Sequence, residues 1–400
     1  MFTHFVSRRR GSAALILALL AVELLDELVS GAFNAAWPLI RADFGLTYEQ
    51  VGLLITLPIV VGSLVEPAIG ILGDTSRRRA MLAGGGIAFV ASVGATSVAP
   101  GWLALLAALA VLNPASGAFV GLSQATLMDL DPERHEQNMA RWVVAGSAGV
   151  LGGAALVAGI ARAGGSWRYA FTALAIFAGI TLAAVVRADV TASHAADAGE
   201  LSSDFRSGLR AALRTLRSGD VRRWLILLES ADLMGDVLEG FLALYLVDVA
   251  HASPAQAAAG VALFTAVGLA GDAMLVLLLE RVEGIRYLRV SVLLTLVMFP
   301  ALLIVPTVEM KFVVIALLGF LNAGWYSIPK ARLYAAVPGQ SATVMTLANT
   351  VGLIGAFVPF TIGAIADRVG LGATMWLLII GPLTLLVGLP RRPRPFPTEL

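Results

Sequence analysis

The 400-residue chain contains no cysteine, only four histidines and few charged residues. The absence of cysteine excludes disulfide bonds, thiolate metal sites and a cysteine nucleophile. Charged residues make up 14% of the chain, against about 25% in a typical soluble domain, so they are too few to cover a water-facing surface. The sequence also lacks a Walker-type phosphate loop and a G-x-S-x-G turn. Direct use of ATP is therefore excluded, and a membrane enzyme would have no recognisable nucleophile.

What the chain has instead is hydrophobic residues, which make up 58% of it and give a mean hydropathy of +0.84. Apolar runs of about 20 residues recur along the whole length, and each is long enough to span roughly 30 Å of hydrocarbon. The sequence predicts an all-α polytopic membrane protein with twelve transmembrane helices. The predicted spans are 12–38, 49–72, 80–98, 102–126, 141–163, 167–187, 222–248, 256–279, 289–306, 311–333, 341–365 and 372–389.

One long polar segment divides these spans six and six. The predicted organisation is an N-terminal six-helix bundle over 1–187, a cytoplasmic linker over 188–221 and a C-terminal six-helix bundle over 222–400. Part of the linker has apolar residues on one helical face among arginines, which is typical of a helix that lies on anionic membrane lipid. A solvated linker helix without lipid contact is the alternative. The apolar residues of that face are Phe205, Leu209, Leu213 and Leu216.

The distribution of basic residues predicts the orientation. With the N-terminus inside, 23 of the 28 Lys and Arg residues fall on the inner side and five on the outer side. Because basic residues concentrate in cytoplasmic loops, both termini are expected to be cytoplasmic. The first span is too long and too acidic for a signal peptide, so we expect it to be retained. The expected location is the inner (plasma) membrane, as a multi-pass protein.

The two halves of the chain also carry an internal repeat. Glu229 follows Glu23 by 206 positions, and Asp232 follows Asp26 by the same interval. Internal repeats of this kind are a signature of secondary transporters, whose sites lie near the midplane between the repeats. Three further pairs keep the offset: Glu66 with Asp272, Asp74 with Glu280, and Gly62 with Gly268.

Nine acidic residues lie in the interior of predicted spans, away from the residues that begin or end a span. A charged side chain at the centre of a span costs about 2.5 to 3.5 kcal/mol on insertion scales, so these acids are expected to face a water-filled cavity or one another. Those of the first and seventh spans follow helical spacing and form one polar stripe on each span. The nine acids are Glu23, Asp26, Glu27, Glu66, Glu229, Asp232, Asp236, Glu239 and Asp272.

Clustered carboxylates at low dielectric bind protons more tightly than carboxylates in water. The sequence shows no opposing cation, because Lys330 and Arg332 are expected to lie at a cytoplasmic helix end, where they reach water. Release and uptake of protons by these acids is the chemistry of a proton-coupled carrier. A structural role, in which single acids hydrogen-bond neighbouring helices while protonated, is the alternative. The predicted proton or cation sites are Asp26, Asp232, Glu23, Glu229, Asp236 and Glu66.

The segment "GILGDTSRRR", residues 70–79, resembles the loop signature G-x-x-x-D-R-x-G-R-R/K of the major facilitator superfamily. Gly70, Asp74, Arg78 and Arg79 match it, whereas Thr75 stands where Arg is usual and Arg77 stands where Gly is usual. The resemblance covers the whole chain, with six plus six spans and a long central loop. It implies that helices 1 and 7 line a central cavity, and that Asp74 with Arg78 and Arg79 latches the two halves in one conformation.

The fifth predicted span is rich in glycine, with Gly146, Gly149 and Gly152 close to one face. It resembles the glycine-rich motif that drug–proton antiporters of the superfamily carry there, but the proline of that motif is missing. Close packing of helices through small residues is the alternative interpretation, and the better one. Gly352 and Gly355 repeat the pattern in the eleventh span.

These observations predict a proton-coupled transporter that works by alternating access and exports cationic or neutral amphiphilic molecules. A carrier of a hard divalent cation, or of a neutral solute such as a sugar, remains an alternative; a membrane enzyme is a remote one. We expect a monomer that binds small molecules, protons and membrane lipid, with no nucleic acid, cofactor or resident metal. Polar span residues that could line the substrate cavity are Asn34, Asn113, Asn322 and Tyr326.

Overall fold

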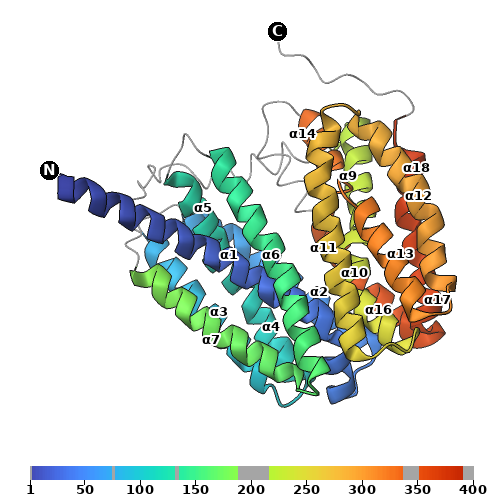
Figure 1. Cartoon of the computed structure of the whole chain (residues 1–400), viewed down its shortest axis with the longest axis horizontal. Helices are drawn as coiled ribbons and strands as arrows, with labels where there is room; N and C mark the ends of the chain where they lie inside the picture. Colours follow the sequence, from blue (N-terminus) through green and yellow to red (C-terminus); the bar gives the residue numbers. More distant parts are fainter. Residues whose placement is uncertain (1, 74–76, 131–134, 188–215, 337–350, 391–400) are drawn as a thin grey trace, which may run out of the picture. The chain divides into compact units, whose positions relative to one another are not determined.

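The computed structural model is helical throughout the part of the chain that it describes, without a β-strand (Figure 1). The described residues are 2–73, 77–130, 135–187, 216–336 and 351–390. Within them, nine helices are long and apolar enough to cross a membrane. The prediction of an all-α polytopic membrane protein is therefore confirmed.

Three predicted spans lie outside this group of nine, and they are the polar ones. The first span, within Phe2–Phe44, carries three acids in its interior, and the seventh, within 219–248, carries four in its interior. The tenth span is interrupted, because the helix Val308–Leu321 ends and a new helix begins at Ser327. Interior acids thus distinguish the first and seventh spans, and an interrupted helix distinguishes the tenth.

The chain divides into two compact units. Unit 1 comprises Met1–Leu46 and Leu54–Gly199, and unit 2 comprises Thr47–Leu53 and Glu200–Leu400. The short segment Thr47–Leu53 belongs to unit 2 although the rest of its helix belongs to unit 1.

Unit 1 is built around its first helix, α1, which packs most extensively on α6 and also contacts α7 (Figure 1). α3 packs on both α4 and α7. The elements are α1 (Phe2–Phe44), α2 (Tyr48–Gly73), α3 (Arg78–Val98), α4 (Trp102–Ser116), the π-helical turn η1 (Gly117–Gly121), α5 (Leu122–Asp129), α6 (His135–Arg162) and α7 (Trp167–Arg187).

Unit 2 has a similar plan, in which α11 packs on α10 and α13, and α9 packs on α14 and α18. A helical segment over 351–355 precedes α16. The remaining elements are α9 (Gly219–Asp232), the π-helical turn η4 (Leu233–Val237), α10 (Leu238–Asp248), α11 (Pro254–Leu279), α12 (Gly284–Ile304), α13 (Val308–Leu321), α14 (Ser327–Ala335), α16 (Val358–Val369), α17 (Leu371–Met375), the 3-10 turn η5 (Trp376–Ile379) and α18 (Ile380–Gly388).

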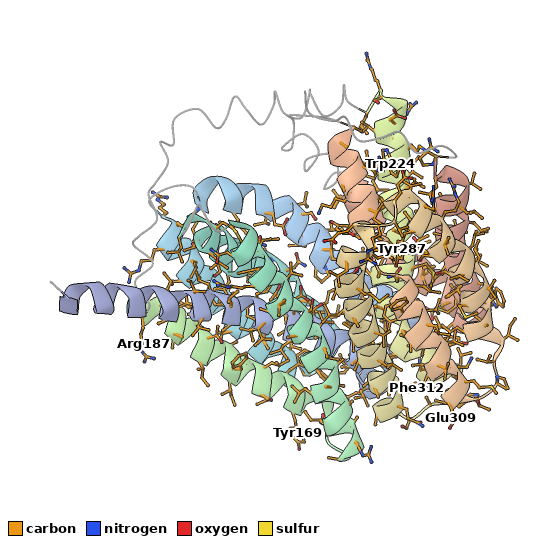
Figure 2. The ribbon with its side chains drawn as sticks, turned by 45° about the horizontal axis from the view of Figure 1, so that its top comes forward. Tyr169, Arg187, Trp224, Tyr287, Glu309 and Phe312 are labelled. Atoms are coloured by element: carbon orange, nitrogen blue, oxygen red, sulfur yellow. The ribbon has the colours of Figure 1, made fainter. Side chains whose placement is uncertain are left out.

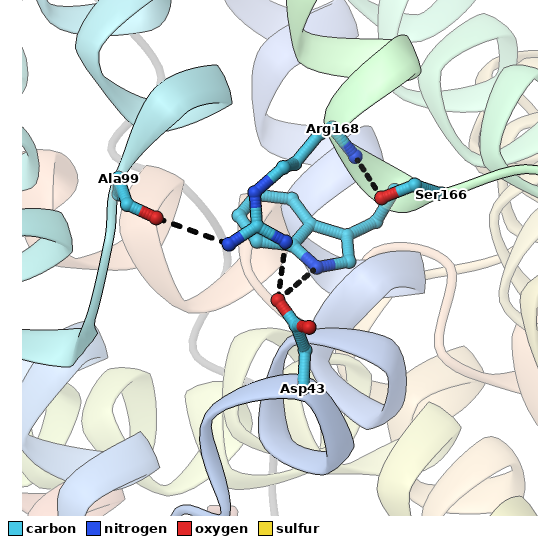
Figure 3. A network of polar contacts seen from close by, with 5 residues as sticks. Asp43, Ala99, Ser166 and Arg168 are labelled. Carbon is cyan, nitrogen blue, oxygen red and sulfur yellow. Dashed lines mark hydrogen bonds and ion pairs between the residues drawn. The ribbon is translucent and has the colours of Figure 1, made fainter.

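An arginine joins three helix ends of unit 1 (Figure 3). Arg168, at the start of α7, pairs with Asp43 near the end of α1 and donates a 3.0 Å hydrogen bond to the carbonyl of Ala99 after α3. Its guanidinium also lies 4.5 Å from the ring centroid of Trp167, whose indole N–H donates to the same Asp43 carboxylate. These contacts fix the ends of α1, α3 and α7 to one another.

A buried lysine likewise binds a helix end in unit 2. Lys311 is only 4% exposed, and its ammonium donates to the hydroxyl of Tyr245 at 2.9 Å and to the carbonyl of Leu302 at 2.6 Å. The carbonyl belongs to the last turn of α12, where helical carbonyls lack partners within their own helix. Lys311, one of the five basic residues that the sequence assigns to the outer side, thus closes a helix end inside the unit.

Candidate functional site

The acids of α1 lie within unit 1 against α4 and α6. Glu23 is 9% exposed, and a Cβ atom added to Gly146 of α6 would lie 2.7 Å from its Oε1 atom. The carboxylate therefore fills the space that any other residue at position 146 would need. Ser116, the last residue of α4, donates a 2.9 Å hydrogen bond to Asp26. Asp26 and Glu27 both lie close enough to Glu23 to repel its carboxylate.

Glu66 of α2 lies beside an irregular segment of α4. Pro114 removes one backbone hydrogen-bond donor, and the π-helical turn η1 follows directly. A Cβ atom on Gly117, the first residue of η1, would lie 3.2 Å from Cγ of Glu66. Because π-helical turns occur frequently at functional sites, this segment supports the placement of Glu66 in the candidate site.

The acids of unit 2 repeat this arrangement. A Cβ atom on Gly355 would lie 2.2 Å from Oε2 of Glu229, and one on Gly352 would lie 3.9 Å from Oε1. Asp232 is the last residue of α9, and Asp236 lies in the π-helical turn η4. Both Asp236 and Glu229 repel Asp232. Among the residues that the structure describes, no group of three His, Asp or Glu side chains could hold a metal ion.

An opposing cation is present in unit 2, contrary to the expectation from sequence. The ammonium of Lys330 interacts attractively with Asp232 and donates a 2.6 Å hydrogen bond to the hydroxyl of Tyr326. The difference arises because the tenth span is broken and its second part, α14, packs on α9, which brings Lys330 toward the acids. Arg332, the other basic residue of this helix, lies 3.7 Å from Glu283.

The break in the tenth span, residues 322–326, is held by side chains of neighbouring helices. The backbone N–H of Gly324, whose φ is +75°, donates a 3.0 Å hydrogen bond to Asp272 of α11. Tyr287 of α12 donates to a carbonyl of the same segment at 3.2 Å (Figure 2). Trp325 is 1% exposed and anchors the segment in the unit. Non-helical backbone at membrane depth is tolerated where it is buried in protein or lines a water-filled cavity, and transporter sites form at such broken helices.

The offset of 206 residues extends to the contacts of the acids, which the sequence analysis missed. Ser116, the partner of Asp26, corresponds to Asn322, and Gly146, beside Glu23, corresponds to Gly352. The same comparison could have identified Ser116 from the sequence, because Asn322 was already a candidate. Further pairs with this offset are Gly149 with Gly355, Asn113 with Gly319, Thr47 with Ser253, and Gln50 with Gln256.

The structure separates the four polar residues expected in the substrate cavity. Asn34 is partly buried on α1, and Asn113 packs on α2, because a Cβ atom on Gly62 would meet its Oδ1 atom at 1.7 Å. The buried Oδ1 atom of Asn322 has no hydrogen-bond partner among the described residues. Tyr326 is 50% exposed beside Lys330. Asn322 and Tyr326 thus come together with the acids of unit 2, whereas Asn113 serves helix packing.

The predicted latch loop is only partly described. Gly70 lies in the last turn of α2, and Arg78 and Arg79 begin α3. Asp74, its acidic member, lies outside the described residues.

Fold and site together define a multi-pass helical membrane protein with acids and broken helices in its polar spans. The sequence matches the family profile of the Major Facilitator Superfamily over residues 19–359, and the chain belongs to that family. It is therefore a membrane transporter of small molecules rather than an enzyme. A search of curated protein sequences gives no significant match.

Solved transporter structures share this fold at low sequence identity. A bacterial homolog of the human lysosomal transporter Spinster, in an inward-facing and unoccupied conformation, is 15% identical with a TM-score of 0.71, and the match covers 95% of this chain and 94% of that one. A variant of the nucleoside transporter NupG is 11% identical, with a TM-score of 0.76 and coverages of 94% and 98%. The peptide transporter POT in complex with sulfate is 14% identical, with a TM-score of 0.71 and coverages of 93% and 94%.

Proposed function

We propose that the protein is a proton-coupled secondary transporter that exports cationic or neutral amphiphilic molecules by alternating access. The observation that carries the proposal is the repeated arrangement of acids. In each unit a glutamate lies against glycine of another helix, Glu23 against one glycine in unit 1 and Glu229 against two in unit 2, and an aspartate follows three residues later. Acids in the membrane are costly, so their retention at equivalent positions of both units favours a role in transport.

Protons are the proposed coupling ion, with Asp26 and Asp232 as the principal sites. Asp26 accepts a hydrogen bond from Ser116, and Asp232 is opposed by Lys330, so each carboxylate has a partner that remains when the proton leaves. Glu23, Glu229, Asp236 and Glu66 are the proposed accessory sites.

The charge balance supports a cationic substrate. In unit 2 the ammonium of Lys330 attracts the carboxylate of Asp232, whereas the carboxylates of Glu229 and Asp236 both repel it, so acids outnumber the base. An acidic surface raises the local concentration of cations and disfavours anions. Export rather than import is proposed on the weaker ground of the glycine-rich fifth span and its resemblance to antiporters.

The remaining features of the proposal concern placement and assembly. We propose that the protein is a monomer in the inner (plasma) membrane, with both termini cytoplasmic because the basic residues concentrate on that side. The two functional bundles are 1–187 and 222–400, joined by the cytoplasmic linker 188–221.

Neutral variants of the two aspartates test the proposal. Purified protein in liposomes with an internal pH-sensitive dye is exposed to tetraphenylphosphonium, a lipophilic cation, and proton movement is recorded. We expect Asp26→Asn and Asp232→Asn to fold like wild type but to lose cation-driven proton movement, because a side-chain amide does not gain or lose a net proton near neutral pH. Glu309→Gln, an exposed change in the first turn of α13, is the matched control and keeps coupling (Figure 2). Wild-type coupling in the Asp26/Asp232 double variant contradicts the assignment.

A further inference from the structure

Two arginines of unit 2 bind the same short stretch of backbone. Arg223, near the start of α9, donates a hydrogen bond from its Nε atom to the carbonyl of Gly388, the last residue of α18. Arg289, near the start of α12, donates a 2.5 Å hydrogen bond to the carbonyl of Pro390, two residues further on. α18 also packs on both α9 and α12 (Figure 1). The starts of two helices and the end of a third are thereby held together, and both guanidinium groups converge on residues 388–390.

The two guanidinium groups keep most of their hydrogen-bonding capacity and all of their charge. A guanidinium has five N–H donors, and one bond to a carbonyl uses only one of them. The carbonyls at the end of a helix lack partners within that helix, so they fix the arginines without neutralising them. Within the part of the chain that the structure describes, neither Arg223 nor Arg289 forms an ion pair with a carboxylate.

Two exposed arginines accompany the fixed pair. Arg222 precedes the first of them on α9, and Arg286 lies one turn before the second on α12. The starts of these two helices carry two acids, Asp220 and Glu283, and Glu283 lies 3.7 Å from Arg332 of α14. Four arginines thus face two acids at these helix starts, one of which already has a basic partner, so this end of unit 2 is positively charged.

An exposed apolar face continues from the arginines along α12. Val290, Leu293 and Val297 follow Arg286 at four, seven and eleven residues, a spacing that places them on one side of a helix, and they are 54%, 47% and 61% exposed. Val387, in the last turn of α18, is 85% exposed. Both helices are long and apolar enough to belong to membrane spans, so these side chains are suited to contact with lipid acyl chains.

We propose that this end of unit 2 binds an anionic phospholipid. Arg222, Arg223, Arg286 and Arg289 hold the phosphate of the headgroup, and the acyl chains lie along the apolar face of α12. The planar fork of a guanidinium matches the oxygens of a phosphate, and basic pockets between spans near a membrane surface are suited to anionic headgroups.

The exposed apolar face favours a lipid over a free phosphate ion. A free ion would use the arginines but leave Val290, Leu293 and Val297 without a partner, whereas a phospholipid contacts both the charged end and the apolar face. The inference requires only that unit 2 spans a membrane, and it depends on neither proton coupling nor the direction of transport.

Lipid binding by the purified full chain in detergent tests the site. The protein is titrated with phosphatidylglycerol or, separately, with phosphatidylcholine, and bound lipids are counted by native mass spectrometry. We expect phosphatidylglycerol to bind several-fold more tightly. Arg222→Gln and Arg286→Gln change exposed side chains, so each variant should fold and should weaken phosphatidylglycerol binding about fivefold while leaving phosphatidylcholine binding unchanged.

An arginine of unit 1 provides the matched control. Arg187 is exposed at the end of α7 (Figure 2), so Arg187→Gln removes the same charge at another span end and should leave phosphatidylglycerol binding unchanged. Equal affinities for the two lipids in wild type, or equal weakening by Arg187→Gln, overturn the proposal. Displacement of the lipid by inorganic phosphate at equal concentration also overturns it, because a bare anion would then fill the site. Binding is read without substrate or a proton gradient, so failure of proton coupling in the liposome assay does not affect this result.

Discussion

Alanine substitutions at the glycines beside Glu23 and Glu229 can separate an effect on proton coupling from an effect on folding. In Gly355→Ala the new Cβ atom would lie 2.2 Å from Oε2 of Glu229, and ordinary van der Waals contact begins at 3.4 Å. The carboxylate must therefore move by 3.4 − 2.2 = 1.2 Å. The atom in the way is the end of a flexible side chain. The backbone can therefore keep its fold, but the carboxylate has to leave its present position.

We expect Gly355→Ala to unfold within a few degrees of wild type but to lose on the order of tenfold in coupled proton movement, since displacements of about 1 Å can cost a factor of 10² at reacting groups. In Gly146→Ala the corresponding displacement at Glu23 is 3.4 − 2.7 = 0.7 Å, so the loss should be smaller. Thermal unfolding in detergent and the liposome dye assay measure the two quantities separately.

Two other glycines of α6 serve as controls. A Cβ atom on Gly153 would lie 2.1 Å from the backbone oxygen of Leu28, so Gly153→Ala should lower the free energy of unfolding by about 1–3 kcal/mol through overpacking. A Cβ atom on Gly159 meets nothing within 4 Å, and Gly159→Ala should stabilise its helix by about 0.5–1 kcal/mol. Wild-type coupling in Gly355→Ala, at unchanged stability, would refute the claim that the glycine positions the Glu229 carboxylate.

Two predictions concern stability. Arg168→Gln loses the ion pair with Asp43 and the bond to Ala99, so the free energy of unfolding should fall by about 2 kcal/mol, while cation-driven proton movement per folded molecule stays unchanged. Lys311→Met leaves a carbonyl at the end of α12 without its charged donor and should lower the free energy of unfolding by about 1–3 kcal/mol, with Lys311→Arg closer to wild type. Unfolding curves that coincide with wild type would contradict either account.

The sequence predicts the helical membrane fold well because each span can be recognised from the hydropathy of its own residues. The stripes of acids could also be predicted from the sequence, since helical spacing places Glu23 and Asp26, or Glu229 and Asp232, near one face of a single helix. Both features are properties of one segment at a time.

The contacts of the acids depend instead on which helices meet. Hydropathy does not reveal the break at 322–326, because the two polar residues of the segment, Asn322 and Tyr326, follow a long apolar run that reads as one span. Without the break Lys330 is expected at a helix end in water. Its interaction with Asp232 follows from the packing of α14 on α9, which no periodicity within one span encodes. The hydrogen bond from Ser116 to Asp26 was partly predictable from the sequence. The offset of 206 residues aligns Ser116 with Asn322, so the internal repeat indicates Ser116 as a candidate site residue.

Proton movement by the purified wild-type protein tests the central claim most directly. Protein in liposomes with an internal pH-sensitive dye is given tetraphenylphosphonium, and the initial rate is compared with that of the Asp26→Asn/Asp232→Asn double variant at equal amounts of folded protein. The account predicts cation-driven proton movement in wild type and none above protein-free liposomes in the double variant. Equal proton movement by both proteins would contradict it, because the acids of α1 and α9 would then have no part in coupling.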